Sequence, residues 1–128
     1  MDSTVRRAGE SEALEVLRSK GVRHRLGVEP DAIRCGTPYL VNGRMLLILI
    51  EQSGECEAHI ASPRIHWNHI HADINEALKF IASIGYNRAY TTVDRPLKTT
   101  ANLITKHGFK LIDQTDKEGV YLWESDWH

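Results

Sequence analysis

Histidines and an arginine gather in one short stretch of the chain. Four of the seven histidines fall there, at His59, His66, His69 and His71. Arg64 stands in a tight polar loop after Ser62-Pro63, and an amphipathic helical pattern follows without a spacer. The first turn of a helix has unpaired N–H groups and a positive dipole end, so a strand-loop-helix succession is suited to anions. The stretch predicts an anion site, such as one for a cofactor phosphate.

Two titratable residues precede that loop and are the candidate catalytic residues. Glu57 and His59 alternate with apolar neighbours on a predicted strand, so their side chains point to the same side of it. A general base must titrate and lie near its substrate, and histidine side chains titrate nearest to neutral pH. The face that carries Glu57 and His59 is either solvent-exposed or the wall of an active-site cleft.

The remaining polar and aromatic residues have simpler interpretations. His66 and His69 would share a helical face, but a closed metal site needs about four ligands and no cysteine or second carboxylate pair accompanies them. The sequence therefore favours histidines facing solvent or a partner chain, and we expect no metal site. Trp67 is interpreted as a packing or interface residue rather than a cofactor stacker, and Trp127 as an interface candidate.

The elements that must position these residues follow from hydrophobic periodicity and turn residues. Strands are predicted over residues 4–7, 38–41, 44–51, 56–61, 88–93, 109–114 and 120–124, with a hairpin turn at Asn42-Gly43. A helix is predicted over 10–20 with Gly21 as its stop, and a short helical turn over 30–34. A second helix carries the stripe Ile70, Ile74, Ala77, Leu78 and Ile81 and closes at Gly85. A third, with Asp94 as its cap and Pro96 near its start, carries Leu97, Ala101 and Ile104 and ends at Gly108.

An antiparallel meander followed by strand-helix-strand units predicts an α/β (α+β) fold, in which helices pack on a mixed sheet. The 128 residues fit a single domain over 1–128. A net charge of −1 gives no electrostatic footprint for nucleic acid, and no apolar run approaches membrane length. Cys35 and Cys56 lack framework spacing and fit free thiols in a reducing cytosol. We expect a cytoplasmic protein with neither nucleic acid nor membrane as partner.

This element order, with Thr105-Lys-His-Gly-Phe109 at the end of the last helix, resembles the GNAT (Gcn5-related N-acetyltransferase) family. Val5-Arg6-Arg7-Ala8 before an acidic helix is similar to the family's opening. The resemblance implies a mostly antiparallel twisted sheet of six to seven strands with three to four helices. It also implies acetyl-CoA as cofactor and a small-molecule or protein amine as acceptor. Among such chains this one is similar to small, divergent forms encoded by tailed bacteriophages, some of which are virion or head-assembly proteins.

The family's pyrophosphate loop, Arg/Gln-x-x-Gly-x-Gly/Ala, corresponds here to the segment that begins at Arg64. Trp67 and His69 occupy the two glycine positions, so the loop is degenerate, because only glycine permits the closest backbone approach. The resemblance implies cofactor-binding positions at Ile60, Ala61, Arg64, Trp67, Asn68 and His69. The family's asparagine at the start of the last helix corresponds to Leu97. Its thiolate-protonating tyrosine corresponds to Ile104, for which Tyr86, Tyr90 or Tyr121 could substitute.

Two hypotheses follow from the sequence. The first is an acyl-CoA-dependent N-acetyltransferase whose loop is degenerate and whose activity is retained, weakened or lost. The second is a non-catalytic GNAT-like phage protein that acts in virion or head assembly through contacts with another protein or with a second copy of the chain. In the second case the protein is found in the host cytoplasm or the virion.

Overall fold

A computed structural model describes residues 4–19, 22, 36–52, 54–95 and 97–125. Its described strands form one seven-stranded sheet in the order β1-β2-β3-β4-β5-β7-β6. The strands are β1 (Val5–Arg7), β2 (Thr37–Val41), β3 (Met45–Gln52), β4 (Glu55–Ala61), β5 (Arg88–Asp94), β6 (Lys110–Gln114) and β7 (Glu118–Glu124). The described helices are α1 (Glu10–Leu17), the 3₁₀-helix η2 (Arg64–His69), α3 (Ile70–Ser83) and α4 (Lys98–Lys106). The predicted fold class, a mixed and mostly antiparallel sheet flanked by helices, is confirmed.

The sheet consists of two antiparallel parts. Strands β1 to β4 form a meander, and the predicted hairpin joins β2 to β3 with Asn42 at φ 53° and Gly43 at φ 68°. Positive φ at both central residues defines the turn whose twist matches that of the strands. Strands β5, β7 and β6 form the second part, and β4 pairs with β5 in parallel to join the two.

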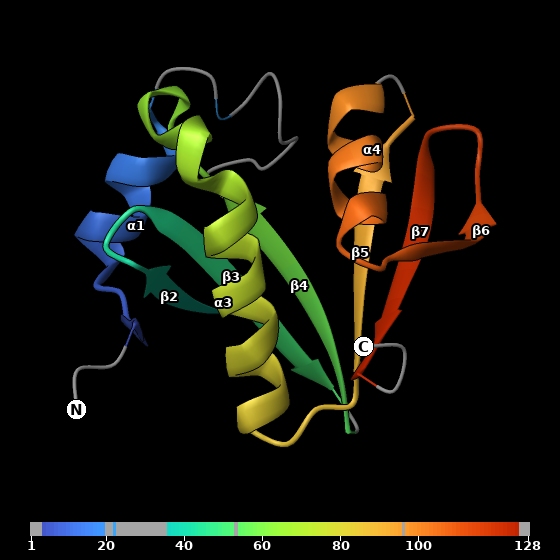
Figure 1. Cartoon of the computed structure of the whole chain (residues 1–128), viewed down its shortest axis with the longest axis horizontal. Helices are drawn as coiled ribbons and strands as arrows, with labels where there is room; N and C mark the ends of the chain where they lie inside the picture. Colours follow the sequence, from blue (N-terminus) through green and yellow to red (C-terminus); the bar gives the residue numbers. More distant parts are fainter. Residues whose placement is uncertain (1–3, 20–21, 23–35, 53, 96, 126–128) are drawn as a thin grey trace.

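The helices cover the two faces of the sheet unequally (Figure 1). Helix α1 packs on the β1–β4 half through a core that includes Ala13, Leu17 and Ile48. Helices α3 and α4 lie on the opposite face, where Ile74 and Ile104 join one larger core. The predicted stripe on α3 does enter this core, because Ile74, Ala77 and Ile81 are all buried.

Several predicted boundaries need correction. Helix α4 begins at Lys98 with Leu97 as its N-cap, so Asp94 is not the cap. Asp94 ends β5, and its backbone carbonyl accepts the Leu97 N–H in a turn before the helix. The residues after β4 form a 3₁₀-helix that runs directly into α3, in place of the expected loop. The predicted Gly21 stop, the helical turn over 30–34 and Pro96 lie outside the described residues.

Candidate functional site

The central feature of the candidate site is a split between β4 and β5. Their register contains only the pairs Cys56↔Ala89 and Glu57↔Tyr90, although β4 continues to Ala61 and β5 to Asp94. The two strands meet near the C-terminal ends of β3 and β7 and then diverge (Figure 1). Beyond Glu57, therefore, the backbone of β4 pairs with β3 on one side. On its other side it pairs with no strand of the described chain.

Glu57 and His59 lie at the base of this split. His59 Nε2 is 3.1 Å from Glu57 Oε1, and 21% of the His59 side chain and 39% of the Glu57 side chain are exposed to solvent. His59 pairs across β3 with Ile48, which belongs to the α1-facing core, so both candidates point to the α1 face of the sheet. A partly exposed imidazole that a carboxylate orients is a suitable general base. Tyr90, the register partner of Glu57, is the predicted substitute acid closest to this pair along the sheet.

The segment after β4 uses much of its backbone hydrogen-bonding capacity internally. The His66 N–H donates to the Pro63 carbonyl over 2.9 Å, and the Ile70 N–H donates to the carbonyl of Trp67. In a 3₁₀-helix each backbone N–H donates to the carbonyl three residues earlier. Since the first such bond is that of His66, only the amides of Arg64 and Ile65 in this helix come before it. The Arg64 side chain is exposed beside a hollow of about 580 Å³ that Ser19, Pro63 and Ile65 also line.

Trp67 folds back over the end of β4. Its indole Nε1–H donates to the Ser62 carbonyl over 2.9 Å, and the side chain is half-buried. Beside it, the Ser62 hydroxyl is fully buried and has no hydrogen-bond partner among the described residues. A buried hydroxyl without a partner costs free energy, so it marks a place where a ligand atom or a water would be stabilising. Asn68 and His69 are exposed at the end of η2, 3.3 Å apart through Nδ2 and Nε2.

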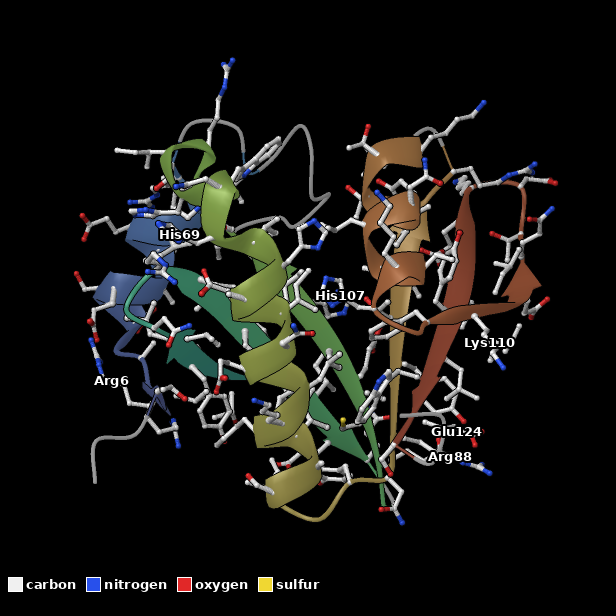
Figure 2. All side chains as sticks on the ribbon, in the orientation of Figure 1. Arg6, His69, Arg88, His107, Lys110 and Glu124 are labelled. Carbon is white, nitrogen blue, oxygen red and sulfur yellow. The ribbon has the colours of Figure 1, made fainter. Side chains whose placement is uncertain are left out.

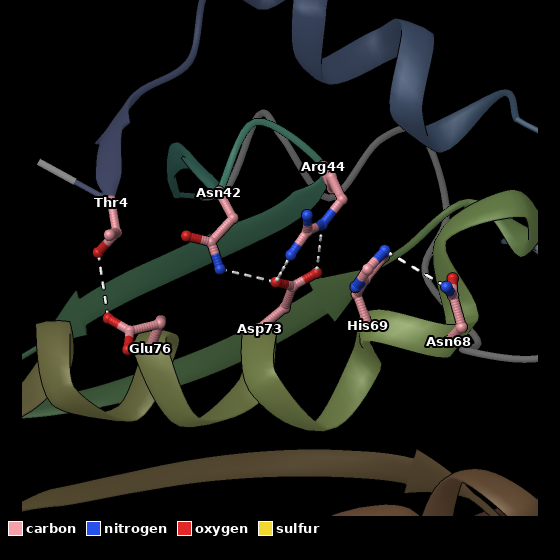
Figure 3. A network of polar contacts seen from close by, with 7 residues as sticks. All are labelled: Thr4, Asn42, Arg44, Asn68, His69, Asp73 and Glu76. Carbon is pink, nitrogen blue, oxygen red and sulfur yellow. Dashed lines mark hydrogen bonds and ion pairs between the residues drawn. The ribbon is translucent and has the colours of Figure 1, made fainter.

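A buried carboxylate, missed in the sequence, fixes the start of α3. Asp73 is fully buried and accepts hydrogen bonds from Asn42 Nδ2 at 2.7 Å and from the guanidinium of Arg44 at 2.6 and 3.2 Å (Figure 3). The network ties the β2–β3 hairpin to the first turn of α3. The available sequence signal was an acid within the apolar stripe, between Ile70 and Ile74.

A second polar cluster, also missed, links α3 to α4. His71 Nδ1 lies 2.8 Å from His107 Nε2, and His107 Nδ1 lies 3.0 Å from Asn75 Oδ1. Figure 2 shows His107 between the two helices. Below it, a hollow of about 350 Å³ extends between α3 and β7, with Leu78 and Trp123 among its lining residues. Because His71 and His107 are 36 residues apart, no local pattern could have paired them.

Other titratable groups lie outside the split. The Tyr86 hydroxyl donates to Glu51 over 2.6 Å, and this hydrogen bond together with the carboxylate charge raises the pKa of Tyr86 to about 12. Burial and the nearby Glu51 raise the pKa of the Cys56 thiol to about 11, so this thiol stays protonated and unreactive at neutral pH. Tyr121 lines a separate hollow of about 230 Å³ beside α4, and Ile104 is buried in the core.

The described residues include neither a metal-ligand cluster nor a membrane-spanning helix. They contain no group of three or more potential metal-ligating side chains. None of the described helices is long and apolar enough to cross a membrane. Trp127 and Cys35, named from the sequence, lie outside the described residues.

The fold is shared with known N-acetyltransferases. No protein-family model and no curated protein matches the sequence. Solved structures do match over nearly the full length of both chains. A spermidine N-acetyltransferase SpeG chimera from Vibrio cholerae and hSSAT has a TM-score of 0.74 at 13% identity, covering 97% of this chain and 96% of that one. The PaiA N-acetyltransferase of Thermoplasma acidophilum, in complex with coenzyme A, has a TM-score of 0.70 at 13% identity, with 97% and 99% covered. A GNAT-family acetyltransferase of Bacillus anthracis has a TM-score of 0.69 at 11% identity, with 95% and 94% covered.

These structural matches establish the GNAT fold. Because the sequence identities are so low, the activity has to be argued from the site.

Proposed function

We propose that the chain is an acyl-CoA-dependent N-acetyltransferase whose acceptor is a small-molecule or protein amine. The observation that carries this proposal is the split between β4 and β5, with the Glu57–His59 pair at its base. An extended ligand could insert between the diverging strands and pair with the backbone of β4. The shared fold with N-acetyltransferases, one of them in complex with coenzyme A, adds support.

The residues present fit such a cofactor in part. The open edge at Ile60 and Ala61 offers backbone groups for the pantetheine arm. The buried Ser62 hydroxyl, for which the described residues provide no hydrogen-bond partner, comes directly after that edge. Arg64 and the amides of residues 64 and 65 are available for phosphate. Trp67, Asn68 and His69 lie on the later part of η2, where backbone N–H groups already have partners, so their contribution is through side chains. The bound cofactor supplies an activated acyl thioester.

The chain's own residues then deprotonate the acceptor and stabilise charge. His59, oriented by Glu57 through Nε2, accepts a proton from the amine nitrogen at Nδ1. A backbone N–H on the open edge of β4 is the donor available for the negative charge that develops on the carbonyl oxygen. Both groups lie at the split, so most of the rate enhancement is expected from positioning the two reactants.

Calorimetry and thiol release test the proposal together. We expect acetyl-CoA to bind with measurable heat and a panel of small amines and N-terminal peptides to release free thiol. His59→Asn and Glu57→Gln should each lower kcat about 100-fold, while acetyl-CoA still binds. Glu55→Gln, an exposed position on the same strand, is the matched control and should leave the rate unchanged. The absence of heat at millimolar acetyl-CoA would overturn the proposal.

A second candidate function is supported by the 3₁₀ geometry of η2. Its amides from His66 onward pair internally and Trp67 covers the end of β4, which is the arrangement expected of a scaffold that no longer holds a pyrophosphate. In this case the protein is a non-catalytic GNAT-fold component of a tailed phage, active in virion or head assembly and found in the host cytoplasm or the virion. It predicts association with a partner or a second copy, lost in Trp67→Ala. A monomer that turns over acetyl-CoA would exclude it.

A further inference from the structure

The cluster of His71, His107 and Asn75 has a defined direction of hydrogen bonding. Asn75 Oδ1 is an acceptor only, so His107 Nδ1 carries the proton in their 3.0 Å contact. In a neutral imidazole the other nitrogen is then an acceptor, so His107 Nε2 accepts the Nδ1–H of His71 over 2.8 Å. This arrangement leaves His71 Nε2 as a basic nitrogen, and no described residue is hydrogen-bonded to it.

His71 lies on the helix that packs across the two diverging strands, β4 and β5. It lies in the first turn of α3, between Ile70 and Ile74, which pack on the core that Ala58 of β4 and Ala89 of β5 share. Its partner His107 comes from the end of α4, across the space between the two helices (Figure 2). The imidazole pair therefore lies on the α3–α4 face of the sheet, opposite the face toward which Glu57 and His59 point.

We propose that His71 is the catalytic residue that returns a proton to the departing thiolate, with His107 and Asn75 as its positioning residues. The inference rests on the proposed acetyltransferase function and deepens it. A thioester held in the split meets the amine and His59 on one face and His71 on the other. Ile104 is buried and has no titratable proton. An acid from another element is therefore needed if the thiol is to leave protonated.

The proton balance of the step is complete. The amine nitrogen forms a C–N bond to the acyl carbon, the C–S bond breaks, and the sulfur takes the electron pair. The proton lost by the amine goes to His59, and the sulfur receives the Nε2 proton of the His71 imidazolium. Solvent then removes the proton from His59 and restores the one on His71. The Nδ1–H bond to His107 is retained throughout, so the ring keeps its orientation.

A leaving-group experiment tests this role. His71→Asn should lower kcat with acetyl-CoA about 100-fold and leave the calorimetric Kd for acetyl-CoA unchanged. With S-(4-nitrophenyl) thioacetate as donor, the same variant should keep a rate within about threefold of wild type, because an acidic aryl thiol leaves without protonation. Ala72→Asn, which places the same side chain at the next exposed position of α3, is the matched control and should match wild type with both donors.

A second measurement does not depend on turnover. Long-range nitrogen–proton NMR spectra of the free protein at alkaline pH should show His71 and His107 as Nδ1–H tautomers. Asn75→Leu should release His107 from that tautomer, whereas Asn75→Asp should retain it.

The results distinguish failure of the proposed role of His71 from failure of the proposed acetyltransferase function. Wild-type turnover with an unchanged His71→Asn rate, an equal loss with both donors, or an Nε2–H tautomer at His71 would each overturn the role of His71 alone. Failure of the wild-type protein to bind or turn over acetyl-CoA would overturn both the role and the proposed function.

Discussion

Asp73 illustrates how one side chain can determine the position of a helix end. Its carboxylate accepts hydrogen bonds from Asn42 and Arg44 and is fully removed from solvent. A carboxylate near the N-terminus of α3 is also favoured by the helix dipole. Since η2 continues directly into α3, these contacts fix the segment that carries Arg64 and Trp67 relative to the β2–β3 hairpin. Sequence analysis could identify the charged residues of this region, but not their partners, because those lie about 30 residues away.

Removing the Asp73 charge should destabilise the fold. Asp73→Asn leaves Arg44 without its carboxylate, and we expect the free energy of unfolding to fall by about 2–4 kcal/mol, measured by urea denaturation. In the Arg44→Met background the same change should cost clearly less, because the two residues share one interaction. Glu76→Gln, which removes an exposed ion pair with Lys79, is the control and should cost at most about 0.5 kcal/mol. Equal costs for Asp73→Asn in both backgrounds would contradict this account.

Tyr86 should titrate at unusually high pH. Its hydrogen bond to Glu51 holds its pKa at about 12, above the usual value of 10, because the carboxylate favours the protonated phenol. The stabilising contribution is therefore complete below pH 10 and is lost as the pH rises from 10 through 12. Tyrosinate absorbance should show one late transition, and Glu51→Gln should move that transition to lower pH. A titration curve unaltered by Glu51→Gln would show that the hydrogen bond does not form in solution.

At the scale of elements, the periodic segments could be predicted and the irregular ones could not. The α3 stripe and the Asn42-Gly43 hairpin follow from local patterns, since each depends on residues a few positions apart. Segment 64–69 has no comparable pattern. Its 3₁₀ geometry depends on the Trp67 indole reaching back to the Ser62 carbonyl and on continuation into α3. The predicted cap of α4 is wrong for a related reason, because the Asp94 carbonyl accepts the Leu97 N–H ahead of the helix and the cap is Leu97.

The start of α1 offers a stabilising substitution. Gly9 is its N-cap with φ −72° and ψ 158°, and it has no side-chain oxygen for the first-turn amides, although its own N–H donates to Glu12. Gly9→Ser should raise the free energy of unfolding by about 0.5–1 kcal/mol, a few tenths from the capping bond and the rest from the lower backbone entropy of the unfolded chain. An added Cβ meets only Glu12 Oε1, at 3.6 Å, so it fits without strain.

Gly9→Ala is the control for backbone entropy, and Gly43→Ser, at φ 68°, should destabilise instead. The measurement is again urea denaturation. A serine that stabilises no more than alanine would show that no capping bond forms.

At the scale of the whole molecule, the two parts of the split sheet are joined by few backbone pairs and by a shared core. Only two register pairs connect β4 to β5, so the common core beneath α3 and α4 supplies most of the contact between the parts. The sequence could predict both strands and the place of β4 in the meander. It could not predict where the pairing of β4 with β5 stops, because the end of that pairing depends on the relative twist of the two parts of the sheet rather than on any residue type.

The split should be visible in hydrogen exchange. Strand β3 pairs on both sides, so its amides at residues 46–49 should be among the slowest. Alternate amides at residues 58–61 and 91–93 face the split and should exchange faster than their sequence neighbours. Acetyl-CoA, if bound there, should slow them. Uniform protection along β4 in the free protein would show that the strands pair beyond Glu57.

The bond from Trp67 to Ser62 also gives the protein a built-in optical reporter. A ligand that recruits the amides of η2 from His66 onward must unwind the 3₁₀-helix, and we expect the indole N–H then to lose the Ser62 carbonyl and donate to water. The chain has three tryptophans, so Trp123→Phe with Trp127→Phe leaves Trp67 as the sole emitter. Its fluorescence would follow, in real time and without a label, whatever enters this end of the sheet.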